Sequence, residues 1–268
     1  MTFGMHQYTS AGAGYRGSLE GWARAGVRQV EPSSDLLDSF LKTETLATAK
    51  RVLTDLNLIA VSGVTGVFGL WEPNPKFEAN LEAFRRRCEQ FAHLGAPVVY
   101  SPCVTQERFT ADDYKRGLDN IRRVAAIAQD FKLKVAAEFV RNSTYMASLP
   151  TALRLKREAA HPNFGILFDC YHFWSGPSKM EDLDLIQPGE IIHVHVNDTP
   201  AMARELLDLR TRVIPGDGVA PLAPILRRLR ERGYAGPATV ELFLPEYQQA
   251  DPFQLAAEIK RKTEPLLS

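Results

Sequence analysis

Short apolar runs alternate with amphipathic segments along this chain, and this alternation restricts its fold more than any other feature. Eight runs have the length and composition of β-strands, at residues 3–9, 26–31, 56–63, 96–102, 132–140, 163–169, 190–198 and 237–243. Six segments of helical period separate or follow them, at residues 37–56, 75–95, 110–131, 144–160, 219–233 and 251–267. Strands that alternate with helices build parallel βαβ units, so we expect an α/β fold.

The number of these units favours a closed barrel. A (β/α)8 barrel typically has about 250 residues, and this chain has 268. An open doubly wound sheet is the alternative, but a dinucleotide-binding sheet would place a Gly-rich turn after its first strand, and none is present here. We therefore predict a parallel, eight-stranded TIM barrel that occupies residues 1–268 as a single domain.

Charge and cysteine content narrow the classes of function. Lys plus Arg and Asp plus Glu each number 32, so the chain lacks the positive excess that binds nucleic acid or anionic membranes. The three cysteines, Cys88, Cys103 and Cys170, include no Cys-x-x-Cys pair, which argues against a disulfide framework and a cysteine-rich zinc site. No secretory signal or membrane-spanning run is recognisable. We expect a cytoplasmic protein with a small-molecule substrate and no nucleic-acid or membrane partner.

Each of the last four predicted strands carries one metal-competent residue near its carboxyl end. Side chains alternate across a strand, and one face of each of these strands is apolar, as the outer helices of a barrel require. The inward face carries, in strand order, Glu138, Asp169, His195 and Glu241. His193 points the same way as His195 but one layer lower, where we expect a hydrogen-bonded core residue. Barrel active sites lie at the carboxyl ends of the strands, so the four residues are expected to converge there.

Three carboxylates that converge without a compensating charge could not all stay ionised inside a barrel. A divalent cation would resolve this conflict. Three oxygen donors and one imidazole suit one Mn²⁺ ion best, and they are also compatible with Mg²⁺, Co²⁺ or Zn²⁺. The sequence therefore predicts a site for one divalent metal ion.

Two residues on the loops that follow are candidates for substrate contact. His172 lies three residues after Asp169, where it would hydrogen-bond a substrate oxygen or relay a proton; an exposed loop histidine is the alternative. Arg212 precedes the Pro-Gly turn of "RVIPGDG" and would clamp a substrate oxygen. The alternative for Arg212 is a loop salt bridge to Asp208 or Asp217.

Weaker candidates lie at other strand ends. His6 ends the first strand and is expected to line the pocket, and Trp174 lies where its ring would stack on the apolar face of a sugar. Glu31, at the end of the second strand, is equally well explained as a pocket residue or as a helix cap. Phe68 and Trp71 would cover either the pocket or the top of the barrel.

Four motifs carry a resemblance to a known family. The stretches "FDCYHF", "HVHVND", "RVIPGDGV" and "GYAGPATVELFLPEY" resemble those of the xylose-isomerase-like TIM barrels. Within that family the chain looks most like inosose (2-keto-myo-inositol) isomerases and, more distantly, like ketose 3-epimerases. The resemblance extends from about residue 130 to residue 248; before that, only the rhythm of strands and helices matches.

The resemblance implies roles for the candidate residues. Members of the family bind one divalent metal ion through the positions that match Glu138, Asp169, His195 and Glu241. Glu138 and Glu241 would also form the acid/base pair, and His172 and Arg212 would touch substrate oxygens. Members of the family are often dimers or tetramers, so the resemblance leaves room for a homo-oligomer.

The resemblance also implies the reaction. It is isomerisation or epimerisation of a keto-sugar or keto-cyclitol, such as an inosose, by proton transfer through a metal-bound enediolate. Ketose 3-epimerases carry a further glutamate where this chain has Thr144, which weakens the epimerase interpretation. The alternative reaction is β-elimination by a metal-dependent lyase or dehydratase that acts on a 3-keto sugar, a keto-glycoside or a dehydroshikimate-like substrate.

Three further interpretations remain open at this stage. A ketol isomerase that shifts a hydride would differ from a proton-transfer enzyme by leaving no solvent deuterium on carbon. Repair of abasic DNA, which related barrels perform with three zinc ions, would need more strand-end histidines and a basic surface than this chain has. A sugar-binding barrel without catalysis is the last alternative.

Overall fold

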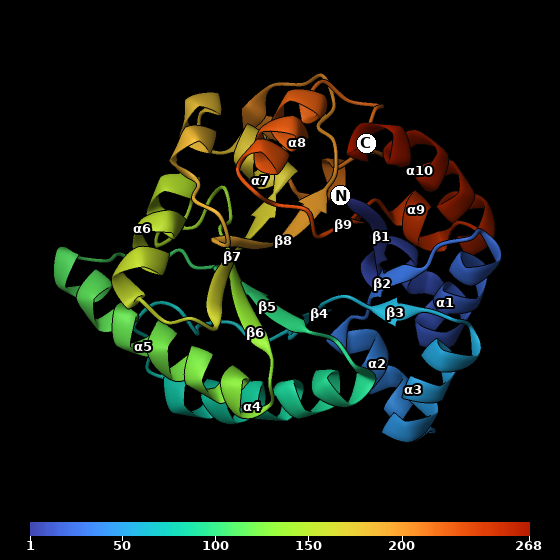
Figure 1. Cartoon of the computed structure of the whole chain (residues 1–268), viewed down its shortest axis with the longest axis horizontal. Coiled ribbons are helices and arrows are strands. Elements are labelled where there is room, and N and C mark those ends of the chain that lie inside the picture. The colour runs from blue at the N-terminus through green and yellow to red at the C-terminus, as the bar shows by residue number, and fades with distance from the viewer.

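The computed structural model describes residues 1–268, and its parallel strands form a barrel surrounded by helices (Figure 1). Neighbouring strands follow the order β3-β2-β1-β9-β8-β7-β6-β5-β4. Their bounds are Thr2–His6 (β1), Gln29–Glu31 (β2), Ile59–Ala60 (β3), Gly63–Val64 (β4), Val98–Pro102 (β5), Lys134–Glu138 (β6), Phe164–Asp169 (β7), Ile191–Val196 (β8) and Pro237–Val240 (β9). All pairings are parallel, which confirms the predicted TIM barrel.

The third strand of the barrel is interrupted, which is why nine strands stand where eight runs were predicted. β3 and β4 both come from the run at residues 56–63, apart from the final residue Val64, and are separated by Val61 and Ser62. β3 pairs with β2, whereas β4 pairs with β5. The two short strands therefore close the barrel together, each on one side.

Helices follow the strands around the outside of the barrel. Their bounds are Gly14–Arg24 (α1), Ser34–Leu41 (α2), Leu46–Asp55 (α3), Phe77–Leu94 (α4), Ala111–Asp130 (α5), Leu149–Ala159 (α6), Cys170–Ser175 (α7), Leu222–Glu231 (α8), Pro245–Gln249 (α9) and Pro252–Leu267 (α10). Short 3-10 turns occupy Gln7–Ala13, Met180–Leu185, Arg204–Leu206 and Leu209–Thr211. The segment predicted as one helix, residues 37–56, is split into α2 and α3, because the Thr45 side chain caps a new helix by accepting from the Thr48 N–H.

Helix α1 was not predicted, because its glycines have a low helix propensity. The structure gives a packing reason for one of them. A Cβ added to Gly21 would lie 2.7 Å from Pro252 Cγ, at the start of α10. The absence of a side chain therefore lets the first and last long helices approach closely, and they lie side by side in Figure 1.

The alternating faces of the strands sort the core into two parts. Val135 and Ala137 of β6 belong to the large apolar core that includes the helices, whereas Ala136 belongs to a small cluster inside the barrel. Leu167 of β7 joins the same inner cluster. Ala136 and Leu167 each lie two residues before a candidate ligand, so an apolar layer lies beneath the candidate site.

Strand β8 departs from strict alternation. Its register with β7 shifts so that Ile166 pairs with Ile191 and Leu167 with His193, which leaves Ile192 as an extra residue in a bulge. Ile192 packs against the inner cluster. Ile192 therefore does not share the outer face of β8 with Val194, although His195 still points inward.

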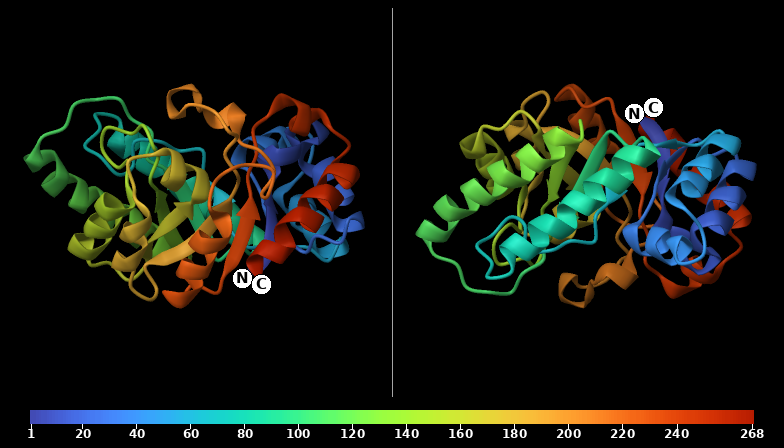
Figure 2. Two further views of the ribbon diagram at one scale, coloured as in Figure 1. Left: turned by 90° about the horizontal axis from the view of Figure 1, so that it is seen from above. Right: turned by 90° about the horizontal axis from the view of Figure 1, so that it is seen from below.

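The two termini lie next to each other (Figure 2). The amino group of Met1 donates to the Leu267 carbonyl oxygen at 3.3 Å. β1 begins at Thr2, so this edge of the barrel holds the amino ends of the strands, opposite the predicted site. Among the helices, none combines the length and the apolar character that crossing a membrane requires.

Candidate active site

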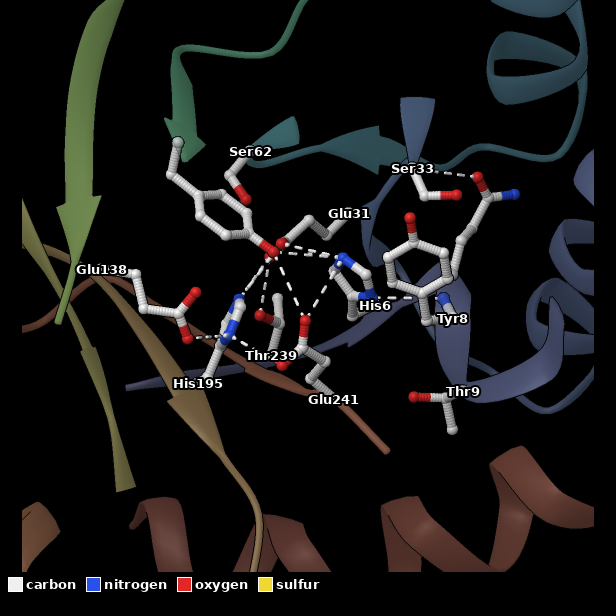
Figure 3. A network of polar contacts seen from close by, with 12 residues as sticks. His6, Tyr8, Thr9, Glu31, Ser33, Ser62, Glu138, His195, Thr239 and Glu241 are labelled. Atoms are coloured by element: carbon white, nitrogen blue, oxygen red, sulfur yellow. Dashed lines mark hydrogen bonds and ion pairs between the residues drawn. The ribbon is translucent and has the colours of Figure 1, made fainter. Parts of the chain in front are cut away.

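Four predicted metal ligands converge at the carboxyl ends of β6, β7, β8 and β9. One donor atom each from Glu138, Asp169, His195 and Glu241 lies within 4.8 Å of all the others, and all four residues are buried. His195 Nδ1 lies 3.4 Å from Glu241 Oε2, 3.7 Å from Asp169 Oδ2 and 3.8 Å from Glu138 Oε1. Figure 3 shows Glu138 and Glu241 on either side of His195.

These residues fit a divalent cation. Two of the four facing atoms, His195 Nδ1 and Glu138 Oε1, are buried and have no hydrogen-bond partner. Buried polar atoms in native proteins are nearly always paired, so two unpaired atoms that face each other point to a missing partner. Bonds of about 2.0–2.2 Å to one ion would separate neighbouring donors by roughly 3–3.6 Å, close to the spacings around His195 Nδ1.

Arg212 lies in the same cluster as the four candidate ligands. Its side chain is 1% exposed and forms ion pairs with Glu241 and, at 3.3 Å, with Asp169 Oδ2. The expectation that the carboxylates lack a compensating charge is therefore wrong, because Arg212 comes from a distant loop whose path the sequence did not show. One guanidinium cannot neutralise three ionised carboxylates, so the cluster can still accommodate a cation.

The loop after β8 holds Arg212 in place. Asp198 Oδ2 accepts hydrogen bonds from the backbone N–H groups of Gly216 at 2.9 Å and Gly218 at 3.1 Å, and its Oδ1 accepts from that of Ala220 at 3.0 Å. Asp198 also pairs with Val213 through the backbone. These contacts fold the loop back over the barrel and explain the Asp of "VND" and the glycines of "PGDG".

Two aromatic rings pack against the guanidinium of Arg212. Its guanidinium carbon lies 4.9 Å from the ring centre of Tyr171 and 5.1 Å from that of Phe243. Rings on a guanidinium add cation–π attraction and exclude water. The loop salt bridge to Asp208 or Asp217, the alternative interpretation of Arg212, is not what the structure shows.

His172 lies beside the four candidate ligands and is 3% exposed, so its interpretation as an exposed loop residue is wrong. Asp169 Oδ1 accepts the His172 N–H at 2.7 Å and so begins helix α7. Burial lowers the pKa of His172 to about 4. Its Nε2 accepts a hydrogen bond from Arg212 Nη2 at 2.9 Å, and it lies 3.8 Å from Glu138 Oε1.

The two glutamates at the site have opposite electrostatic surroundings. Burial, and then the nearby charge of Glu241, raise the pKa of Glu138 well above its ordinary value. Burial also raises the pKa of Glu241, but the charges of His195 and Arg212 outweigh burial and lower it to about 2. Two carboxyl groups with pKa values pushed apart are typical of an acid/base pair.

A cavity of about 370 Å³ opens above these groups. Its floor is polar, with Glu138, His172, Arg212 and Glu241, and its walls are largely apolar. Phe68, Val104 and Leu209 line it and are each about half exposed. The complete lining consists of Tyr8, Asp35, Val64, Gly66, Phe68, Tyr100, Pro102, Val104, Glu138, Val140, His172, Leu209, Arg212, Glu241 and Phe243.

Three further candidates do not line this cavity. His6 is buried beneath it, 3.7 Å from Glu241 and 3.3 Å from the Tyr100 hydroxyl. Trp174 lies to one side, with the Arg204 guanidinium 5.2 Å from its ring centre. Trp71 is fully buried and donates to the Ser101 carbonyl oxygen, so it belongs to the core, not to a lid.

Glu31 has more partners in the structure than its position in the sequence indicates. It is fully buried, ends β2 and contacts three histidines inside the barrel. The interpretation as a helix cap is wrong, because Ser33 caps α2. The alternation of side chains along β2 indicates that Glu31 points into the barrel. Its partners come from strands far away in the sequence, so they could not be assigned.

Comparison with known proteins identifies the family of this chain. A model of the xylose isomerase-like TIM barrel matches residues 20–262. The chain belongs to this family. Inosose isomerase of Halalkalibacterium halodurans is 30% identical to this xylose isomerase-like barrel over 232 residues, which are 85% of this chain and 80% of that protein.

One more relative and one solved structure are similar to this barrel. The 3-dehydroshikimate dehydratase of Pseudomonas putida is 26% identical over 189 residues, which are 68% of this chain but 29% of that protein. A solved structure of the IolI protein with a bound zinc atom covers 100% of this chain and 98% of its own, with a TM-score of 0.93 and 22% identity. The named relatives are isomerases and dehydratases, so this family member is an enzyme.

Proposed function

We propose that this xylose isomerase-like barrel is a divalent-metal-dependent isomerase or epimerase of a keto-sugar or keto-cyclitol, such as an inosose. The observation that carries the proposal is the convergence of four buried donors, two of whose facing atoms have no other partner. The inosose isomerase relative supports the substrate class.

The metal would be held by Glu138, Asp169, His195 and Glu241, and Mn²⁺ is the ion we expect. When bound, a divalent cation polarises a carbonyl and stabilises the negative charge that develops when the neighbouring carbon loses a proton. Three oxygen donors with one nitrogen suit Mn²⁺, and they are also compatible with Mg²⁺, Co²⁺ or Zn²⁺.

The protein's own groups would move the proton. Glu241 is held ionised by His195 and Arg212, so it is suited to remove a proton from the carbon next to the carbonyl. Glu138 comes from β6, whereas Glu241 follows β9, and β7 and β8 lie between them, so the two carboxyl groups approach a substrate from two sides. Glu138 would take up a proton from solvent and deliver it to a different face or carbon of the substrate, and Glu241 would release the abstracted proton to solvent.

His172 and Arg212 would orient the substrate. Both line the cavity, and their side chains already contact each other. His172 is neutral near pH 7 because its pKa is about 4, so it can share a hydrogen bond with a hydroxyl group without adding a charge. Arg212 can offer its fork of N–H groups to an oxygen that becomes negative during the reaction.

Deuterium exchange tests the proposal. The protein is incubated in D₂O with Mn²⁺ and a panel of inososes and ketohexoses, and products are followed by NMR. We expect deuterium on the carbon next to the carbonyl with the native protein and none with Glu241→Gln. An isomerised product that carries no deuterium would indicate a hydride shift, and a panel in which no substrate exchanges would contradict the proposal.

A second candidate function, β-elimination from a keto-glycoside, is favoured by the cavity walls. Phe68, Val104 and Leu209 offer a half-exposed apolar rim that a free, fully hydroxylated cyclitol would not use. An apolar aglycone on a keto-sugar would cover this rim. Release of the aglycone with formation of an enone, detected by NMR, would support the lyase; deuterium exchange without release would support the isomerase.

A further inference from the structure

We propose that Glu31 is a positioning residue that fixes His195 as a metal ligand through its Nδ1 atom. This inference rests on the metal site of the proposed function. It assigns a role to a residue that does not line the cavity and would touch neither metal nor substrate.

The two ring nitrogens of His195 face different partners. Nδ1 faces the three carboxylates of the candidate metal site at 3.4–3.8 Å. Nε2 faces Glu31, at 3.1 Å from Oε1 and 3.3 Å from Oε2 (Figure 3). An ionised carboxylate can only accept hydrogen bonds, so Nε2 must carry the proton, and the lone pair of a neutral ring then lies on Nδ1.

Glu31 is itself held firmly. The Thr239 hydroxyl donates to its Oε2 at 2.8 Å, His193 Nε2 lies 2.6 Å from the same oxygen, and His6 Nε2 lies 3.4 Å from Oε1. These partners come from three strands, β9, β8 and β1. A carboxylate fixed by several strands can fix the ring plane of His195 as well as its tautomer.

The same contacts argue against a second metal ion between Glu31, His193 and His195, although these three groups could in principle bind one. Donors around one ion would stand roughly 3 Å or more apart, given bond lengths of about 2.0–2.2 Å. The 2.6 Å between His193 Nε2 and Glu31 Oε2 is the length of a direct hydrogen bond. Glu31 therefore belongs to the layer that supports the metal site.

Metal titration of the full-length protein tests this role. Co²⁺ affinity is measured by calorimetry, and the visible absorption of bound Co²⁺ reports its ligand set. We expect Glu31→Leu to weaken Co²⁺ binding about 100-fold and to change the spectrum, and Glu31→Gln to weaken it about tenfold, because an amide oxygen still accepts from Nε2–H. Glu190→Gln is the matched control, since Glu190 is a buried carboxylate that pairs with Arg157.

The outcomes separate this inference from the proposed function. If the native protein binds no Co²⁺, Mn²⁺ or Zn²⁺, the proposed metal site is wrong and the role of Glu31 falls with it. If the native protein binds Co²⁺ and both Glu31 variants bind it with native affinity and spectrum, the role of Glu31 is wrong and the metal site stands. If Glu31→Leu does not fold, Glu31→Gln alone decides, because unchanged affinity in that variant already contradicts the inference.

Discussion

At the scale of single residues, Arg212 concentrates several interactions in one side chain. It pairs with Asp169 and Glu241, hydrogen-bonds His172 and lies against two aromatic rings. A lysine would keep the charge, but it could not make these contacts at once, because it lacks the planar fork of donors.

We therefore expect Arg212→Lys to lower kcat/KM for proton exchange by roughly 10–100-fold, the value of one or two hydrogen bonds between charged groups. Steady-state kinetics of exchange measure the effect. The control is Arg210→Lys on the same loop, since Arg210 is exposed. Equal activity of the two variants would show that the position of Arg212 is not used in the reaction.

Metal affinity should rise with pH. Burial, together with the charge of Glu241, raises the pKa of Glu138. Burial alone would lower the pKa of His195, but the carboxylates of Glu31 and Glu241 raise it above its ordinary value. Both groups therefore hold protons in the metal-free protein at pH values where free side chains would have lost them, and a cation must displace these protons. Each proton released should strengthen binding by up to about tenfold per pH unit.

Calorimetry in buffers of different ionisation enthalpy measures this proton release directly. We expect weaker Mn²⁺ binding in acidic than in neutral buffer and net proton release on binding. Affinity that stays constant as the pH falls would show that neither group carries a proton before the metal binds.

What the sequence could predict at this scale was the direction of side chains within a strand. Alternation alone brought Glu138, Asp169 and His195 to the same end of the barrel, and the structure places them together. The partners of Arg212 and Glu31 were out of reach, because they depend on how distant segments meet in three dimensions. The same holds for His6, which the closing of the barrel buries beneath the cavity.

At the scale of elements, the strands were easier to predict than the helices. Buried strands have continuous apolar runs bounded by turns, and all eight runs were located. Helix α1 was not predicted, because it contains glycines, which have a low helix propensity but allow close packing.

Two glycines of α1 provide a matched test of that trade-off. A Cβ at Gly21 would lie 2.7 Å from Pro252 Cγ, whereas the nearest atom to a Cβ at Gly17 is 3.5 Å away. We expect Gly21→Ala to lower the free energy of unfolding by about 1–3 kcal/mol through overpacking, and Gly17→Ala to raise it by up to about 1 kcal/mol through better helix propensity. Urea unfolding of both variants measures the difference, and equal effects would mean that α1 and α10 do not constrain each other.

At the scale of the whole molecule, the count of strand–helix units and the chain length together gave the fold, because few other folds accommodate eight parallel units. The break in the third strand was not predictable, since it depends on pairing with different neighbours on its two sides.

We propose that the barrel unfolds as one domain, because β1 and β9 join the two ends of the chain in a single sheet. Far-ultraviolet circular dichroism and tryptophan fluorescence should then report the same midpoint in urea, since cooperative unfolding affects all probes together. Trp22 on α1 and Trp71 in the loop before α4 lie in different parts of the chain and make the comparison sensitive. Two separate midpoints would indicate independent units.

Ala136 and Leu167 form an apolar layer beneath the candidate ligands, and the cavity lies on the opposite side of those ligands. If the four donors hold an ion and a substrate occupies the cavity above them, the bound substrate would block the path from the ion to solvent. A chelator should therefore remove the ion more slowly from the substrate-saturated enzyme than from the free enzyme. The order of departure would be imposed by the shape of the interior alone, with the organic ligand first and the ion second.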